Sequence, residues 1–182
     1  MKMKFTFLPV LVACLIFSSA LSAQVTGDYR SVNAPDPTGG NWSDITKWER
    51  YNGSSWVAAA VAPTSADQTI TIRTGDNIIL DAPVTADQLV VETGAFLSIN
   101  AFLSASGGND LTLNNGTGTY VTVNGTLLLG AVNVISGAGD ILINGTFNWY
   151  SGTLAASTIT AAASVTNFDL DFTKYLNAAF TN

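Results

Sequence analysis

Histidine is absent from the 182-residue sequence, and the only cysteine is Cys14. Without histidine, the chain has no Ser-His-Asp triad, no histidine general base and no ordinary histidine zinc site. Cys14 lies in an N-terminal stretch that is expected to be removed, so the remaining chain has no thiol. Disulfides and cysteine metal sites are therefore excluded, and the sequence predicts no cofactor and no metal site.

Basic residues are also few. Only 11% of the residues are charged, and five lysines and arginines follow residue 23, against thirteen aspartates and glutamates. The chain without its first 23 residues therefore has a net charge of −8. This balance excludes nucleic acid as a partner, because binding to the phosphate backbone requires clustered lysines and arginines. The five basic residues are Arg30, Lys47, Arg50, Arg73 and Lys174.

The first 23 residues have the three parts of an export signal. Lys2 and Lys4 are followed by the apolar run FTFLPVLVACLIF and then by the small residues SSALSA. This order predicts a signal peptide that is cleaved near Ala23, with secretion or display at the outer cell surface. The apolar run is too short to favour a membrane span. The motif LVAC, which ends at Cys14, resembles a bacterial lipobox, so lipidation of Cys14 is the alternative.

From Gln68 onward, short runs of Val, Ile, Leu and Thr alternate with Gly, Asn and Asp. Runs of four to six such residues between turn residues are typical of β-strands, and no stretch has a convincing helical period. Asn-Gly-Thr begins at Asn124 and again at Asn144. Earlier glycine turns are spaced by 19 and 22 residues, at Gly75, Gly94 and Gly116.

A period of about twenty residues, made of short strands and Gly/Asn corners, is typical of a β-solenoid. Superposing the two Asn-Gly-Thr turns aligns four alternating pairs of apolar residues, as expected for one buried face. The pairs are Val121/Ile141, Val123/Ile143, Leu127/Phe147 and Leu129/Trp149. We therefore predict an all-β chain that forms a right-handed parallel β-helix with an aromatic N-terminal cap. A β-sandwich is the alternative, because Asn-Gly is also a hairpin signal.

The chain is predicted to have three parts. Residues 1–23 are the signal peptide, residues 24–67 form a Trp-rich N-terminal cap with loops, and residues 68–182 form the β-solenoid. The stretches GNWSDITKWERYNGSSWVAA and APTSADQTITIRTGD resemble the N-terminal region of large secreted, adhesin-like surface proteins of Bacteroidota. That resemblance covers roughly residues 27–100 and implies a signal peptide, a Trp-rich segment and then a right-handed β-helix.

Proteins of this kind often end in a sorting domain that the type IX secretion machinery reads. This sequence ends in FDLDFTKYLNAAFTN, which departs from that pattern and favours a truncated solenoid or a freely secreted piece. The resemblance implies a non-catalytic, secreted or cell-surface scaffold whose partners are glycans or other surface proteins. The alternative is the N-terminal portion of a carbohydrate-binding or polysaccharide-cleaving β-helix protein.

Aromatic residues give the candidate carbohydrate-binding site. Trp42, Trp48, Tyr51 and Trp56 lie within fifteen residues, and aromatic faces pack on the C–H faces of sugar rings. The competing interpretation is a cap, because the first coil of a solenoid exposes apolar surface and strand edges that require a cover. Tyr150 is added to the candidate site because the register directs it outward, whereas its neighbour points into the core.

Catalytic residues are not predicted. Lyase or hydrolase chemistry on a β-helix requires two facing carboxylates, or a lysine or arginine assisted by Ca²⁺. The acidic residues of the solenoid stand singly, apart from Asp169 and Asp171, which could hold Ca²⁺ weakly. The sequence therefore predicts that the chain is not an enzyme.

Overall fold

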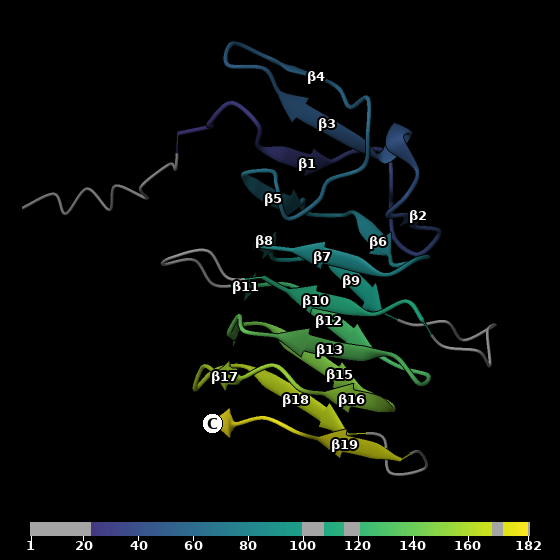
Figure 1. The fold of residues 1–182 in the computed structure, drawn as a ribbon, viewed down its shortest axis with the longest axis vertical. Coiled ribbons are helices and arrows are strands. Elements are labelled where there is room, and N and C mark those ends of the chain that lie inside the picture. The colour runs from purple at the N-terminus through teal and green to yellow at the C-terminus, as the bar shows by residue number, and fades with distance from the viewer. Residues whose placement is uncertain (1–22, 100–107, 115–120, 169–172, 182) are drawn as a thin grey trace, which may run out of the picture.

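A computed structural model describes residues 23–99, 108–114, 121–168 and 173–181. These residues form β-strands and one short 3₁₀ turn, η1 (Ile45–Lys47), and the strands make about five coils of about twenty residues each. Figure 1 shows the coils stacked along the long axis, from the blue strands β3 and β4 at the top to the yellow C-terminal strands at the bottom. The predicted fold class, an all-β parallel β-helix, is confirmed.

Three sheets form the sides of the β-helix, and they are parallel except at β3 and β4. The nine-stranded sheet contains, in spatial order, β20 (Phe180–Thr181), β17 (Thr158–Thr160), β14 (Ile141–Ile143), β11 (Val121–Val123), β8 (Gln88–Val91), β5 (Thr69–Ile72), β1 (Tyr29–Ser31), β3 (Trp48–Tyr51) and β4 (Trp56–Ala58). The six-stranded sheet contains β18 (Val165–Phe168), β15 (Thr146–Trp149), β12 (Thr126–Leu129), β9 (Phe96–Ile99), β6 (Asn77–Ile79) and β2 (Gly40–Asn41). The five-stranded sheet contains β19 (Lys174–Leu176), β16 (Gly152–Leu154), β13 (Val134–Gly137), β10 (Leu111–Leu113) and β7 (Val84–Ala86).

The predicted register between successive coils is confirmed. Thr122 lies beside Leu142, and Leu128 lies beside Asn148, on the outer faces of their sheets. The predicted inward residues are at most 3% exposed and pair as Val121/Ile141, Val123/Ile143, Leu127/Phe147 and Leu129/Trp149. Because side chains alternate along a strand, this register directs every second residue of each coil into one core.

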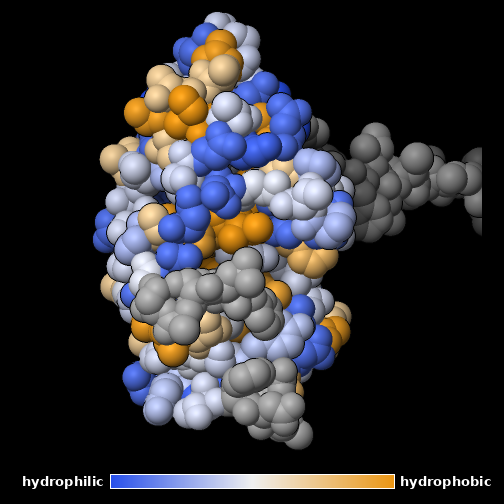
Figure 2. All heavy atoms as spheres, turned by 90° about the vertical axis from the view of Figure 1, so that its right-hand side faces the viewer, coloured by the Kyte–Doolittle hydropathy of each residue, from blue (hydrophilic) through white to orange (hydrophobic). Residues whose placement is uncertain are grey.

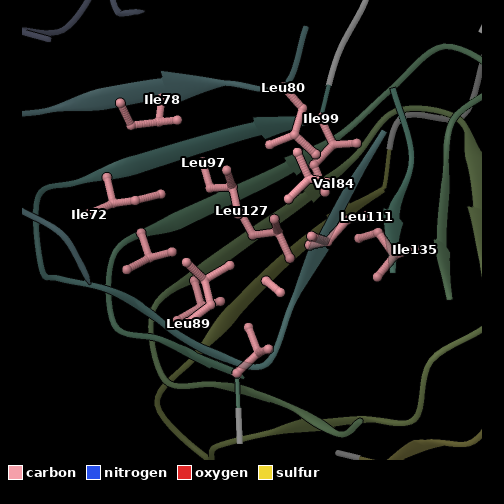
Figure 3. Packing of buried hydrophobic residues seen from close by; sticks show 14 of the residues in the cluster. Ile72, Ile78, Leu80, Val84, Leu89, Leu97, Ile99, Leu111, Leu127 and Ile135 are labelled. Carbon is pink, nitrogen blue, oxygen red and sulfur yellow. The ribbon is translucent and has the colours of Figure 1, made fainter. Parts of the chain in front are cut away.

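The core is a column of aliphatic side chains that runs between the three sheets. Figure 3 shows Ile72 and Leu89 from the nine-stranded sheet, Leu97 and Leu127 from the six-stranded sheet, and Leu111 from the five-stranded sheet directed into the same interior. These side chains are at most 2% exposed. Each coil therefore buries its apolar residues against the coils above and below, which one coil cannot do alone.

Gly125 and Gly145 mark the repeated turn because the coils approach each other closely there. Neither glycine has a positive φ, and a Cβ at either position would overlap a backbone carbonyl oxygen of the preceding coil. Positive φ, which glycine tolerates, occurs instead at Gly75 and Gly94, with φ of 85° and 76°. At the repeated turn, Nδ2 of Asn144 donates to Oδ1 of Asn124 at 2.9 Å, so the recurring asparagine links neighbouring coils.

One coil is longer than the predicted period. Val91 pairs with Val123, so the corner that stacks on Gly94 is at Gly125. Gly116 itself lies outside the described residues. The coil between β8 and β11 also includes residues 100–107 and 115–120, which are outside the described residues. Val91 and Val123 are nevertheless both buried and paired, so the register continues across this longer coil.

We call residues 24–67 the cap, because they extend the stack at its N-terminal end. β1 pairs in parallel with β5, and β2 pairs in parallel with β6, so both strands continue the coil register. β3 then runs antiparallel to β1, and β4 runs antiparallel to β3. This reversal of strand direction ends the coil repeat at the edge of the nine-stranded sheet.

Candidate functional site

Trp42 and Trp48, two of the predicted sugar-stacking residues, lie inside the cap. Their side chains are 3% and 1% exposed, and the rings meet edge to face with centroids 4.9 Å apart. Nε1 of Trp48 donates to the carbonyl oxygen of Trp42 at 2.8 Å, and Nε1 of Trp42 donates to that of Pro63 at 3.0 Å. Because both rings are enclosed, neither has a face open to a sugar, and the pair supports the cap interpretation.

Tyr51 and Trp56 lie on the outer face of the cap and are half-buried. They are cross-strand partners on β3 and β4, with ring centroids 5.4 Å apart. The guanidinium of Arg30 lies 4.3 Å from the Trp56 ring centroid, and its Nη2 is 2.6 Å from Oε2 of Glu49. Of the four predicted sugar-stacking residues in the cap, these two are accessible from solvent.

A cleft of about 280 Å³ opens beside this group, at the outer face of β1 and β5. Its lining combines both signs of charge with hydroxyl groups and one indole ring. The lining residues are Ala23, Gln24, Asp28, Arg30, Trp56, Thr69, Thr71, Arg73 and Glu92. Such a mixture of donors, acceptors and an aromatic edge suits a small polar ligand.

Arg73 and Glu92 occupy neighbouring positions on successive coils. Ile72 pairs with Val91, and each charged residue follows its strand by one position. This pair is not predicted above, although the 19-residue spacing of Gly75 and Gly94 also separates Arg73 from Glu92. Applying the repeat to charged residues as well as to apolar ones would have placed the two side chains together.

Asp76 joins the cap to the first corner of the solenoid. Its carboxylate accepts hydrogen bonds from Oγ of Ser31 at 2.6 Å and from the backbone N–H of Ala34 at 3.2 Å. The Ser31 hydroxyl in turn accepts from the backbone N–H of Arg73 at 2.8 Å. Asp76 is only 8% exposed, so its carboxylate connects the cap and the solenoid inside the protein rather than lying on the surface.

Burial and hydrogen bonding shift the pKa of two groups in the cap. Burial raises the pKa of Tyr29, and the Asp67 carboxylate acts in the same direction. Hydrogen bonds from the hydroxyl and the backbone N–H of Thr46 lower the pKa of Asp44. The contribution of Asp44 to stability is therefore lost as pH falls through its lowered pKa, and that of Tyr29 is lost as pH rises through its raised pKa.

Trp149 and Tyr150 separate as predicted into an inward and an outward residue. Trp149 is 3% exposed and packs against Phe147 and Phe168, with both centroid distances 5.9 Å. Tyr150 is half-buried at the end of β15, more than a coil away from the cap. The structure therefore does not bring Tyr150 together with the other predicted carbohydrate-binding residues.

Trp149 also carries a buried N–H without a hydrogen-bond partner among the described residues, whereas the buried N–H of Trp48 is bonded. We expect Trp149→Phe to change the free energy of unfolding by less than about 1 kcal/mol, because the lost volume is offset by removal of an unsatisfied donor. Trp48→Phe should lower the free energy of unfolding by roughly 1–3 kcal/mol more than Trp149→Phe does, because it leaves the buried carbonyl oxygen of Trp42 without its hydrogen-bond donor. Urea unfolding of both variants measures the difference, and equal losses would contradict the prediction.

Acidic residues do not gather into a site within the described ranges. No group of three or more Asp or Glu side chains there is arranged to hold a metal ion. The candidate Ca²⁺ pair, Asp169 and Asp171, lies outside the described residues. On the face drawn in Figure 2, hydrophilic residues cover much of the upper half, and the hydrophobic patches are small and separate.

Two further observations bear on the class of protein. In the part of the chain that the structure describes, no helix has the length and apolar character needed to cross a membrane. Comparison of the chain with protein-family models, with curated proteins and with solved structures gives no match.

Proposed function

We propose that this chain is a non-catalytic, secreted or cell-surface β-solenoid that acts as an adhesin-like scaffold. The observation that carries the proposal is the stack of coils with an apolar interior and uncharged sides. No charged residue occurs in any strand from β9 to β18, and the outward positions there are mostly Ser, Thr, Asn or aliphatic residues. Continuous hydrogen bonding between coils makes such a stack a stiff support for groups on its surface.

The export signal and the resemblance to adhesin-like proteins of Bacteroidota support the same proposal. In this role, residues 1–23 direct the chain across the membrane and are removed near Ala23, and Cys14 is removed with them. The scaffold then presents its cap and outer faces to glycans or to other surface proteins. Lipidation at Cys14 would place the same solenoid on the membrane surface instead.

Fractionation of bacterial cells that express the full chain tests this proposal. We expect the protein in the medium or exposed to added protease on intact cells, with an N-terminus at Gln24. An N-terminus at Cys14 with an attached lipid would support surface anchoring rather than free secretion. Retention in the cytoplasm with residues 1–23 intact would overturn the proposed location.

A carbohydrate-binding role is the second candidate, and one observation favours it. Tyr51, Trp56 and the polar cleft lie side by side on the outer face of the cap. Aromatic rings beside charged and hydroxyl groups are the combination that recognises sugar rings and their hydroxyls.

The scaffold proposal predicts no cleavage of polysaccharides. Isolated carboxylates on open sheet faces stay solvated, so they are weak general bases at neutral pH. Purified residues 24–182 should therefore release no product above a buffer control from pectin, alginate, chitin or xylan, with or without Ca²⁺. Product release that is abolished by Asp169→Asn together with Asp171→Asn would show that the chain is an enzyme.

A further inference from the structure

The cleft beside β1 and β5 contains two charged side chains that lie together without forming an ion pair. Among the described residues, the structure gives ion pairs to Arg30 and to Arg50, but none to Arg73. Glu92 is the residue beside Arg73 on the next coil, and its backbone N–H donates to the carbonyl oxygen of Ile72 at 3.0 Å. Opposite charges at neighbouring positions usually pair, so their separation here requires an explanation.

Each of the two side chains is held by another group. Nε of Arg73 donates to the carbonyl oxygen of Ser31 at 2.8 Å, which directs the guanidinium toward β1. Oε2 of Glu92 accepts from the backbone N–H of Thr74 at 2.9 Å and from its hydroxyl at 3.2 Å. These hydrogen bonds use Nε of Arg73 and Oε2 of Glu92. The two Nη nitrogens of Arg73 and Oε1 of Glu92 make no hydrogen bond among the described residues, so they are available to a ligand as donors and as an acceptor.

The charge of the cleft selects the class of ligand. The side chains of Arg30 and Arg73 are balanced by those of Asp28 and Glu92, so the side chains of the lining have no net charge, while the side chains after residue 23 together carry −8. An acidic polysaccharide is repelled by that overall charge and meets no excess of basic side chains in the cleft. A neutral ligand that both donates and accepts hydrogen bonds suits the lining better.

We propose that this cleft binds a neutral pyranoside, whose adjacent hydroxyls bridge the guanidinium of Arg73 and the carboxylate of Glu92. A sugar hydroxyl can accept a hydrogen bond from the guanidinium and donate one to the carboxylate, so it satisfies both side chains at once. The hydroxyls of Thr69 and Thr71 supply further contacts, and Trp56 flanks the sugar ring. This site deepens the carbohydrate-binding role proposed above, on which it rests, and does not depend on the scaffold role.

Titration calorimetry of the processed chain, residues 24–182, tests the proposal. The probes are cellohexaose, xylohexaose, mannohexaose and chitohexaose, with trigalacturonate as the acidic comparison. We expect saturable binding of at least one neutral probe and weaker or no binding of trigalacturonate. Glu92→Gln and Arg73→Gln should each weaken that binding about tenfold or more, the effect of losing a hydrogen bond to a charged group.

Glu92→Gln keeps an acceptor for Thr74, so it tests the site even if Arg73→Gln fails to fold. Arg50→Gln is the matched control, because Arg50 lies in the cap near Asp67 but does not line the cleft, and it should leave binding within about twofold. Binding of a neutral probe that neither cleft variant changes would overturn this site while leaving a carbohydrate-binding role in place. Binding of trigalacturonate alone, or of no probe, would overturn the proposal.

Discussion

Replacing Leu129 with Asp is expected to prevent folding. Leu129 is 0% exposed and lies between Ile99 of the preceding coil and Trp149 of the next, so the new carboxylate has apolar neighbours on both sides. An unpaired charge in such a place costs several kcal/mol, which is comparable to the whole stability of a domain of this size. Circular dichroism and chromatography of the purified variant should show loss of β-structure or recovery only as aggregate.

Leu128→Asp is the matched control, since it makes the same change one residue earlier. Leu128 lies on the outer face of the six-stranded sheet, where the carboxylate keeps contact with water. We expect this variant to fold and to lose less than about 1 kcal/mol of unfolding free energy. A folded Leu129→Asp protein together with an unfolded Leu128→Asp protein would mean that the two faces of β12 are exchanged.

Deleting residues 28–57 is expected to make the protein aggregate. The deletion removes the buried residues Trp42 and Trp48 and uncovers the edges of β5 and β6, which β1 and β2 occupy in the intact chain. An uncovered coil combines unpaired backbone groups with an apolar interior, and both features recruit further strands. Light scattering after size-exclusion chromatography should therefore show much larger species for the deletion variant than for the intact chain.

Lysines at the uncovered edge provide the control for that deletion. Thr69→Lys and Thr71→Lys place charges at outward positions of β5, where they oppose pairing between molecules without entering the core. The deleted chain that carries both lysines should therefore form less aggregate than the deleted chain without them. A deletion variant that stays monomeric with unchanged thermal stability would rule out the cap interpretation. It would instead favour a carbohydrate-binding role for the aromatic residues of this segment.

The sequence was sufficient to predict the coil register, because two periods act together. Alternation along a strand fixes which residues face inward, and the repeated Asn-Gly-Thr turn fixes which residues of successive coils are partners. Val123 and Ile143 could thus be paired without any structural information, and the structure places them side by side. Trp149 was assigned to the core by the same reasoning, although a tryptophan next to a tyrosine also suggests an exposed platform.

Features that depend on spatial neighbours outside the repeat could not be predicted. Coil length cannot be read from glycines alone: the 22-residue spacing of Gly94 and Gly116 predicts a shorter coil than the one that pairs Val91 with Val123. Which aromatic residues of the cap are buried and which are exposed depends on how β3 and β4 pair. Trp48 faces the core from β3, whereas Trp56 lies on the outer face of β4. The buried role of Asp76 depends on a contact with Ser31, which lies 45 residues away in the chain.

Disulfide formation between coils is the measurement that tests the solenoid register most directly. The processed chain has no cysteine, so any disulfide that forms must join the two introduced cysteines. Thr122 and Leu142 are partners on adjacent parallel strands, and strands about 4.8 Å apart fall within the Cα separation of a disulfide. A hairpin around Asn124 and Gly125 would instead pair Thr122 with Leu127. The account predicts that oxidised Thr122→Cys/Leu142→Cys forms an intramolecular disulfide and that Thr122→Cys/Leu127→Cys does not, and the reverse result would contradict it.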